Sequence, residues 1–306
     1  MVEILVNGPR KEKIMTTPKI LVTGAGGKPA SYVVEQLIEE GFPVRALVRR
    51  LDERSDRLIS LGAEVIVGDF LDIKSLRSAM AGIKRAYFCY PPADRLLEAT
   101  TNFAIVAKEV DLETLVNMSQ FEVRDAHQSH LANQHWLGER VLEWSGLNVT
   151  HIRPTFFAEM SLILNGKTIT SEGKMYLPYG DGKHAPVAAE DIARVVVGVL
   201  KDPGPHAGKI YKVTGQKELS ITEIAEIFST ILGKPVEYVD IPLEAWQKAL
   251  ADLGLSPFLI QHLGHMAEDH KNGFFAGVTD VVHKVGGREP QSLEDFIRAN
   301  AKAFGA

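Results

Sequence analysis

The predicted fold rests on the sequence Val22-Thr23-Gly24-Ala25-Gly26-Gly27-Lys28-Pro29-Ala30. This segment follows an apolar run and opens a stretch with helical spacing, which is the context of a dinucleotide-binding turn. Gly24 lets the chain leave the strand sharply, and Gly27 lets the backbone approach a diphosphate, whose charge the N–H groups of the helix terminus would receive. A glycine-rich turn without a ligand is the alternative. The predicted cofactor-binding positions in this segment are Thr23, Gly24, Gly26, Gly27, Lys28, Pro29 and Ala30.

Short apolar runs alternate with longer amphipathic segments from Lys19 to about Pro154. Several of these runs are continuously apolar, which is typical of strands in a parallel sheet that helices cover on both faces. Helices are predicted from about residue 30 to 41 and from about 127 to 145. The order of elements predicts an α/β fold with a Rossmann-type doubly wound parallel sheet. The predicted strands are 20–23, 44–48, 64–67, 86–89, 114–116 and 149–152.

The pattern changes after Pro154. Loop signals surround short apolar runs in 155–186, a helix is predicted over 188–200, and strands are predicted at 209–213 and near 236–239. Met15 is a plausible alternative start, so the first residues are interpreted as a tail. The predicted division is an N-terminal tail at 1–18, a Rossmann domain at 19–155 that 186–215 complete, and a smaller α/β substrate-side lobe from 156–185 and 216–306.

The composition excludes several classes of protein. The 306 residues are 45% apolar and 24% charged, which is ordinary for a globular chain. The net charge of −5, without a basic cluster, disfavours nucleic-acid and membrane surfaces. The single cysteine, Cys89, excludes an internal disulfide, and we interpret it as a small buried apolar residue rather than a nucleophile. No run approaches the ~20 apolar residues of a membrane span. We therefore expect a soluble cytoplasmic enzyme.

The end of the second predicted strand indicates which cofactor is preferred. The strand runs into Arg49 and Arg50, without a carboxylate that would bind the adenosine ribose hydroxyls and repel a 2′-phosphate. A guanidinium group suits a phosphate dianion both by its charge and by its forked geometry. We therefore expect NADP(H) to be preferred over NAD(H), with Arg49 as the better candidate. Two arginines on an exposed loop are the alternative.

Taken together, these segments resemble the NmrA-like branch of the atypical short-chain dehydrogenases/reductases. The resemblance implies a Rossmann domain that binds NADP, adenine contacts near Asp69 and Phe70, and a nicotinamide site bounded by Tyr90, Ser119 and Pro154. Similar proteins include quinone, azo-dye and triphenylmethane-dye reductases, and also redox-sensing regulators. The residues that carry the resemblance are, in order, Gly24-Ala-Gly-Gly27-Lys-Pro-Ala30, Ala46-Leu-Val-Arg49, Gly68-Asp69, Glu139, Ser145-Gly146-Leu147, Ile152-Arg153-Pro154, Phe157 and Asp191-Ile-Ala193.

Asp69 has two interpretations. A carboxylate directly after a strand can accept a hydrogen bond from the adenine amino group. It can equally cap a helix predicted over 73–80, or pair with a nearby base.

The catalytic prediction departs from the usual pattern of carbonyl-reducing relatives, which carry a serine and then a Tyr-x-x-x-Lys pair. The resemblance places Ser119 at the serine, but Leu131 and His135 stand in place of the tyrosine and lysine. Because Glu139 lies one helical turn after His135, it could orient the imidazole or raise its pKa, and a histidine that titrates near neutrality could donate a proton. The predicted catalytic residues are therefore His135 and Ser119. A histidine bonded to Glu139, or one that contacts a cofactor ribose, is the alternative.

Several apolar groups follow the strands at the predicted nicotinamide end. Planar substrates could stack on them, although packing of the smaller lobe explains them equally well. His262, His265 and His270 have metal-ligating chemistry but lack the His-Glu-x-x-His pattern, so we predict no metal. The candidate substrate-pocket residues are Phe121, Phe156, Phe157 and Met160.

Two functions compete. The first is an NADPH-dependent oxidoreductase that transfers hydride to a small aromatic acceptor such as a quinone or an azo compound. The second is a non-catalytic NADP(H) sensor that acts through a protein partner, because catalysis could be lost with the Tyr–Lys pair. A ketone reductase or isomerase of specialised metabolism is a third alternative.

Overall fold

A seven-stranded parallel sheet forms the centre of the larger domain in the computed structural model, which describes residues 17–305. Its strand order is β3-β2-β1-β4-β5-β6-β9. The connection from β3 to β4 returns past β2 and β1, so the direction in which strands are added reverses between β1 and β4, as in a doubly wound dinucleotide-binding sheet. The strands are β1 (Ile20–Thr23), β2 (Val44–Val48), β3 (Glu64–Val67), β4 (Arg85–Phe88), β5 (Thr114–Met118), β6 (Val149–Pro154) and β9 (Ile210–Val213).

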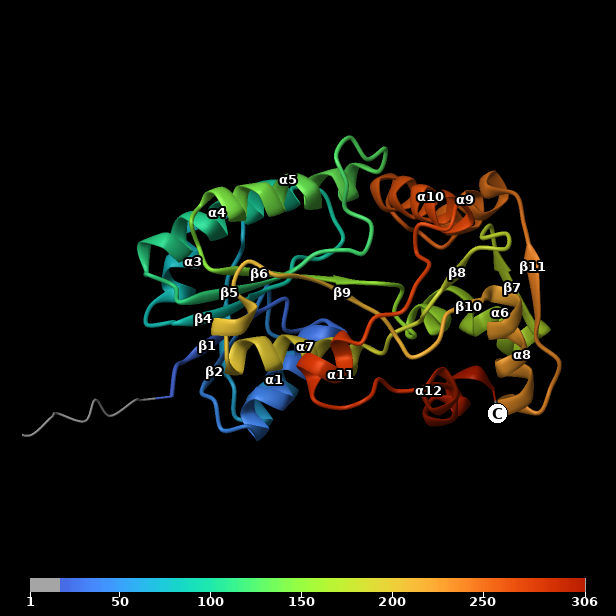
Figure 1. Cartoon of the computed structure of the whole chain (residues 1–306), viewed down its shortest axis with the longest axis horizontal. Coiled ribbons are helices and arrows are strands. Elements are labelled where there is room, and N and C mark those ends of the chain that lie inside the picture. Colours follow the sequence, from blue (N-terminus) through green and yellow to red (C-terminus); the bar gives the residue numbers. More distant parts are fainter. Residues whose placement is uncertain (1–16, 306) are drawn as a thin grey trace, which may run out of the picture.

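Helices cover both faces of this sheet (Figure 1). Helices α1, α7 and α11 pack on one face, and α3, α4 and α5 pack on the other. Each face has its own buried cluster, which explains why the strands are apolar on both sides. The helices are α1 (Lys28–Glu39), α2 (Glu53–Ser60), α3 (Ile73–Met80), α4 (Leu96–Glu109), α5 (His130–Trp144), α7 (Ala189–Lys201) and α11 (Val281–Gly286).

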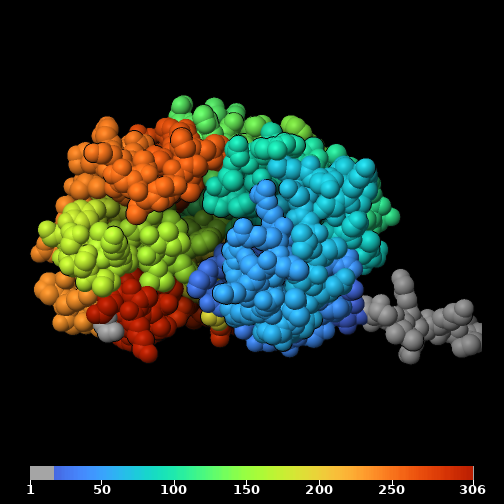
Figure 2. Space-filling model, turned by 180° about the vertical axis from the view of Figure 1, so that it is seen from behind, coloured from blue at the N-terminus to red at the C-terminus, as the bar shows by residue number. Residues whose placement is uncertain are grey.

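The remaining elements build a smaller lobe with a separate hydrophobic core (Figure 1). Two small sheets lie in this lobe, in which β7 pairs with β11 in parallel and β8 pairs with β10 antiparallel. The surface is hollowed where the lobe meets the sheet domain (Figure 2). The lobe contains β7 (Lys174–Leu177), β8 (Lys183–His184), β10 (Leu219–Ser220), β11 (Glu237–Asp240), α6 (Gly166–Glu172), α8 (Ile221–Leu232), α9 (Leu243–Asp252), α10 (Pro257–Lys271), α12 (Leu293–Ala299) and the short turns η1 (Ser161–Asn165) and η3 (Ala301–Phe304).

The predicted fold class is confirmed, with small shifts at the ends of elements. The helix predicted from residue 127 begins at His130, because the Ser129 side chain caps it by accepting from the N–H of Ala132 at 3.2 Å. Helix α11 was predicted in the smaller lobe, but its Val282 is buried in the same core as α1 and α7. Most of the tail predicted at 1–18 lies outside the described residues. Within residues 17–305, no helix is long and apolar enough to span a bilayer.

Candidate cofactor and substrate site

The carboxyl ends of the central strands meet at one edge of the sheet, and the residues predicted for cofactor binding lie there. In a doubly wound sheet, a ligand binds in the crevice where the strand order reverses, which is between β1 and β4 in this chain. The hollow in Figure 2 lies between this domain and the smaller lobe. Strand order therefore places the glycine turn after β1 at the expected position for a dinucleotide.

The turn after β1 packs tightly against the end of β4. Gly24 has a φ of +62°, and a Cβ atom there would lie 2.6 Å from the carbonyl oxygen of Cys89. The Gly27 N–H donates to the Gly24 carbonyl at 2.8 Å and closes the turn. The Thr23 hydroxyl is buried and accepts from the Cys89 N–H at 2.8 Å, so the Thr23 side chain holds β1 against β4 rather than facing a ligand.

The first backbone N–H groups of α1 face this turn without a side-chain cap. Its N-cap is Gly27, which has no side chain to satisfy the first N–H groups, and its first turn carries no acidic residue. These N–H groups and the positive end of the helix dipole suit a diphosphate. Pro29 fits the first turn because its missing N–H is not needed there, and Ala30 is fully buried against the sheet. Lys28 is exposed.

Three arginine side chains lie beyond the end of β2. Arg49 and Arg50 are exposed, as the sequence predicts. Arg54 was not predicted, yet its guanidinium carbon lies 3.7 Å from the position of a Cβ atom on Gly26. The charged run in the sequence contains Arg54, but only the folded start of α2 brings it beside the glycine turn. A guanidinium group beside the glycine turn suits a phosphate dianion.

Asp52 does not offer a free carboxylate to a ribose. It caps α2 by accepting from the N–H of Ser55 in a capping box, and it pairs with Arg54 at 2.5 Å. The hydrogen bond from Arg54 lowers the pKa of Asp52 to about 2. The carboxylate is therefore ionised and already occupied, which agrees with the predicted absence of a ribose-binding acid after β2.

Asp69, Phe70 and Tyr90 come together after β3 and β4. The Asp69 carboxylate accepts from the N–H of Leu71 at 2.9 Å, and Asp72 caps α3 instead. The interpretation of Asp69 as the cap of this helix is therefore wrong. Phe70 and Tyr90 meet edge to face, with their centroids 5.4 Å apart. Together they form an aromatic wall next to the Asp69 carboxylate.

The two predicted catalytic residues lie on neighbouring elements, β5 and α5. Ser119 follows β5, and its buried hydroxyl has no hydrogen-bond partner among the described residues. Glu139 is fully buried on α5 and binds Arg153 of β6 through both guanidinium branches, with one contact at 2.9 Å. No hydrogen bond joins Glu139 to His135 in the described part of the chain. The expectation that Glu139 orients His135 is therefore wrong, because Arg153 is the stronger partner.

The protonation of His135 also differs from the prediction. Burial lowers the pKa of His135 to about 4, and the opposing effect of the nearby Glu139 charge is too small to reverse this. His135 is therefore neutral at pH 7 and can donate a hydrogen bond from its one ring N–H, but it is not an imidazolium acid. Burial alone would raise the pKa of Glu139, yet the ion pair with Arg153 keeps it below its ordinary value.

A cavity opens beside the end of β6, and three of the four predicted pocket residues line it. These are Phe156, Phe157 and Met160, which follow Pro154 directly along the chain. The enclosed space is about 30 Å³, which is room for one or two water molecules, and the cavity is partly open to solvent. Phe121 does not line this cavity, because it packs on Phe275 with a centroid distance of 5.6 Å.

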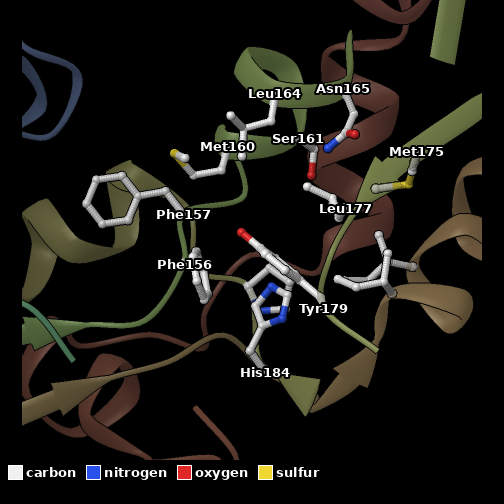
Figure 3. A pocket seen from close by; sticks show the side chains of 13 residues that line it. Phe156, Phe157, Met160, Ser161, Leu164, Asn165, Met175, Leu177, Tyr179 and His184 are labelled. Carbon is white, nitrogen blue, oxygen red and sulfur yellow. The ribbon is translucent and has the colours of Figure 1, made fainter. Parts of the chain in front are cut away.

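Polar side chains that were not predicted also face this cavity. Ser161 and Asn165 come from η1, and Tyr179 and His184 come from the opposite wall (Figure 3). The sequence signal at Tyr179 was interpreted only as a turn, because Gly180 follows it. Nothing in the linear sequence indicates that this turn faces the end of β6.

The histidines of α10 point to separate partners. His262 bonds the Ser129 hydroxyl at 2.8 Å, His265 bonds Glu268 at 2.8 Å, and His270 bonds His184 at 2.9 Å. They therefore do not converge as metal ligands. Another potential ligand group of the described residues is Glu139, Glu143 and His151. Its two carboxylates already belong to ion pairs, Glu139 with Arg153 and Glu143 with Arg140.

Cys89 is half-buried, not fully buried as the sequence predicts. Burial raises the pKa of its thiol to about 11, so the thiolate form is scarce at neutral pH. Its contribution to the site is its backbone, which contacts Thr23 and Gly24.

Comparison with known proteins agrees with this geometry. The sequence matches the NmrA-like family over residues 16–297. The chain belongs to that family. It is 32% identical to an NAD(P)H azoreductase of Xenophilus azovorans over 289 residues, covering 94% of this chain and 99% of the relative.

Several solved structures share the fold. The NADPH-dependent quinone oxidoreductase QOR2 of Escherichia coli, in complex with NADPH, superposes with a TM-score of 0.82 at 24% identity, covering 92% of this chain and 99% of that one. The negative transcriptional regulator NmrA in complex with NADP superposes with a TM-score of 0.76 at 17% identity, covering 92% and 94%. The Rossmann-like architecture predicted from the sequence is therefore confirmed.

Proposed function

We propose that this chain is an NADPH-dependent oxidoreductase that reduces a small aromatic acceptor, such as a quinone or an azo compound. The observation that carries the proposal is the bare glycine turn after β1, with arginines on one side and an aromatic cavity on the other. Similarity to an azoreductase at 32% identity and to a quinone oxidoreductase with the same fold supports this choice.

The residues present fit this cofactor. Gly24, Gly26 and Gly27, with the first N–H groups of α1, would hold the diphosphate. Arg49 and Arg54 would bind the 2′-phosphate, which gives a preference for NADP(H) over NAD(H). The remaining proposed contacts are to the adenine and to the nicotinamide, from Asp69, Phe70, Tyr90, Ser119 and Pro154.

NADPH supplies a hydride, and the acceptor gains this hydride and one proton from water, which gives a hydroquinone or a hydrazine. Such acceptors are already electrophilic, so positioning contributes more than a strong acid does. The neutral His135 and the unpaired Ser119 hydroxyl would therefore act as hydrogen-bond donors to the acceptor or to the cofactor.

Calorimetry and turnover test this proposal together. The purified protein should bind NADPH more tightly than NADH, and it should oxidise NADPH steadily when a quinone or an azo dye is added. Absence of binding to either nucleotide would reject the cofactor site. Tight binding without turnover on any acceptor would instead favour an NADP(H) sensor, a role that the neutral His135 and the fold shared with the NmrA regulator also support.

The arginine cluster gives a sharper test of cofactor preference. Replacing Arg54 by alanine removes one charged donor, so the ratio of NADPH to NADH affinity should fall about tenfold or more, and Arg49→Asp should lower it further. Arg57→Ala is the matched control, because this arginine of the same helix pairs with Glu35. An unchanged ratio in both Arg49 and Arg54 variants would refute the assignment of the 2′-phosphate.

A further inference from the structure

A buried ion pair joins α5 to the strand that ends at the proposed nicotinamide position. Glu139 of α5 is fully buried, and Arg153 of β6 donates to both of its carboxylate oxygens, with the contact to Oε1 at 2.9 Å. Arg153 directly precedes Pro154. Desolvation of two buried charges costs several kcal/mol, and apolar residues of similar volume often replace such a pair without loss of stability. Stability alone therefore does not account for this pair.

The pair sets the electrostatic surroundings of His135, which lies one helical turn before Glu139. The charged and titratable groups around this ring are Glu139 on its own helix, Arg153 on β6 and His262 on α10. Burial lowers the pKa of His262 to about 3, so His262 brings no charge at neutral pH. Burial also lowers the pKa of His135, the charge of Glu139 opposes this, and the charge of Arg153 adds to it. The protonation of His135 thus depends on how Glu139 is paired.

A second arginine, Arg140, lies beside the same carboxylate but does not replace Arg153. Its guanidinium is 3.6 Å from Glu139 Oε2, and its closer contact is with Glu143. Without Arg153, the Glu139 carboxylate would keep this cation nearby and stay ionised, but its Oε1 atom would lose its donor. The freed oxygen would then lie one turn from His135, where it would accept a hydrogen bond from the protonated ring and stabilise it.

We infer that Arg153 is a positioning residue that binds the Glu139 carboxylate in place of His135 and so keeps the imidazole ring neutral beside the cofactor. This inference rests on the proposed function, which places His135 and Pro154 at the reactive end of the cofactor. An oxidised nicotinamide carries a positive charge, so an imidazolium beside it would disfavour the oxidised form. Because the Glu139–Arg153 pair has no net charge, it prevents this repulsion without adding another.

Histidine NMR on the protein without nucleotide tests the effect on His135, with its signal assigned by comparison with His135→Asn. In Arg153→Met, the proton affinity of His135 should rise about a hundredfold, which moves its titration from about pH 4 to about pH 6. Arg153→Lys keeps the charge, so it should raise the affinity less than about tenfold. Arg140→Met is the matched control, because Arg140 contacts the same carboxylate but binds Glu143, and it should change the affinity less than about threefold.

The double variant Glu139→Gln/Arg153→Met separates the charge of Glu139 from the packing of Arg153. It removes both charges together, so no carboxylate is freed and the titration of His135 should return to its wild-type range. An equal shift in the single and the double variant would show that lost packing perturbs the ring, and it would overturn the inference. An unshifted titration in Arg153→Met would overturn it as well.

Calorimetry with both redox forms of the cofactor tests the consequence at the site. At about pH 6, Arg153→Met should bind NADP+ about threefold or more weakly relative to NADPH than wild type does, and the ratio should recover at about pH 8, where His135 is neutral. An unchanged ratio in a variant whose His135 titrates at pH 6 would overturn the placement of this ring beside the cofactor. A wild-type protein that binds neither nucleotide would contradict the proposed function, while the NMR titration would still decide whether Arg153 controls His135.

Discussion

Gly24 illustrates how a single residue serves both the fold and the proposed site. Its left-handed backbone and its contact with the Cys89 carbonyl leave no room for a side chain. Gly41 has a similar conformation, with φ at +80°, but a Cβ atom there would meet nothing within 4 Å. An alanine at Gly41 would therefore introduce backbone strain alone, whereas an alanine at Gly24 would introduce both backbone strain and a steric clash.

We predict that Gly24→Ala destabilises the protein more than Gly41→Ala does. Gly41→Ala should cost about 1 kcal/mol from left-handed strain alone, and Gly24→Ala should cost about 1–3 kcal/mol more from overpacking. Only Gly24→Ala should also abolish the heat of NADPH binding, because the turn must move. Urea unfolding and calorimetry on both variants measure these effects, and equal stability losses would contradict the predicted clash.

Glu139 shows the limit of reasoning from one helix. The sequence correctly places His135 and Glu139 one turn apart, which predicts an interaction between them. It does not reveal that Arg153 arrives from β6 and takes both carboxylate oxygens. A partner with two parallel donors, supplied by another element, displaces the local one. Tertiary partners of this kind cannot be read from spacing.

At the scale of elements, Asp69 and Asp72 have different structural roles at the start of α3. Both acids follow β3, and the sequence alone permits either to cap α3. Asp72 caps α3, because its side chain accepts from the N–H of Lys74 at 3.0 Å. The Asp69 side chain accepts from the N–H of Leu71 in the turn before the helix. Asp69 therefore retains one carboxylate oxygen for a ligand.

This division predicts opposite effects of two substitutions. Asp72→Ala should lower the free energy of unfolding by about 1 kcal/mol and leave NADPH affinity unchanged. Asp69→Asn keeps the oxygen that accepts from Leu71 but removes the charge, so NADPH affinity should fall about tenfold with little change in stability. Thermal unfolding and calorimetry check the pair. Loss of affinity in the Asp72 variant alone would reverse the assignment.

The strands were the most predictable elements, because they are short and mostly apolar, and the central strands β1, β2 and β5 are buried along their whole length. The six strands predicted before residue 155 all occur, and the seventh, β9, follows the prediction at 209–213. Arg54 and Tyr179 were missed for the opposite reason. Arg54 lies at a helix start and Tyr179 lies in a turn, and the sequence indicates only this local structure. Which residues lie opposite each of them depends on the tertiary fold.

At the scale of the whole molecule, buried histidines join the two parts of the chain. His262 on α10 bonds the cap residue of α5, and His127 bonds Asp269 of α10 at 2.8 Å, which also pairs with Arg124. Hydrogen bonds from imidazole rings therefore join α10 of the smaller lobe to the segment at the start of α5. Because burial lowers the pKa of His262, protonation of this ring at low pH opposes its contact with Ser129.

We predict that stability falls steeply between pH 6.5 and 5. Burial lowers the pKa of His262 to about 3, and that of His135 and His270 to about 4, from an ordinary 6.5. Below pH 6.5 these histidines bind protons in the unfolded chain but stay neutral in the folded chain. Each of them therefore lowers the free energy of unfolding by about 1.4 kcal/mol per pH unit until its folded pKa is reached. Above pH 6.5 these histidines are neutral in both states, so they do not lower the free energy of unfolding.

His262→Gln should flatten this acid dependence, since glutamine can still bond Ser129 but does not titrate. The difference in unfolding free energy between pH 7 and pH 5 should shrink by about 2 kcal/mol in this variant, as measured by urea unfolding. His265→Gln, on the same helix but paired with Glu268 near the surface, should retain the wild-type dependence. Carboxylates do not cause a fall in this window. Those whose folded pKa is lowered, such as Glu139, lose their contribution only below their ordinary pKa, and burial raises the pKa of Glu159, which favours the folded chain as the pH falls. If both variants followed the wild-type curve, the buried His262 would not link the attachment of the lobe to pH.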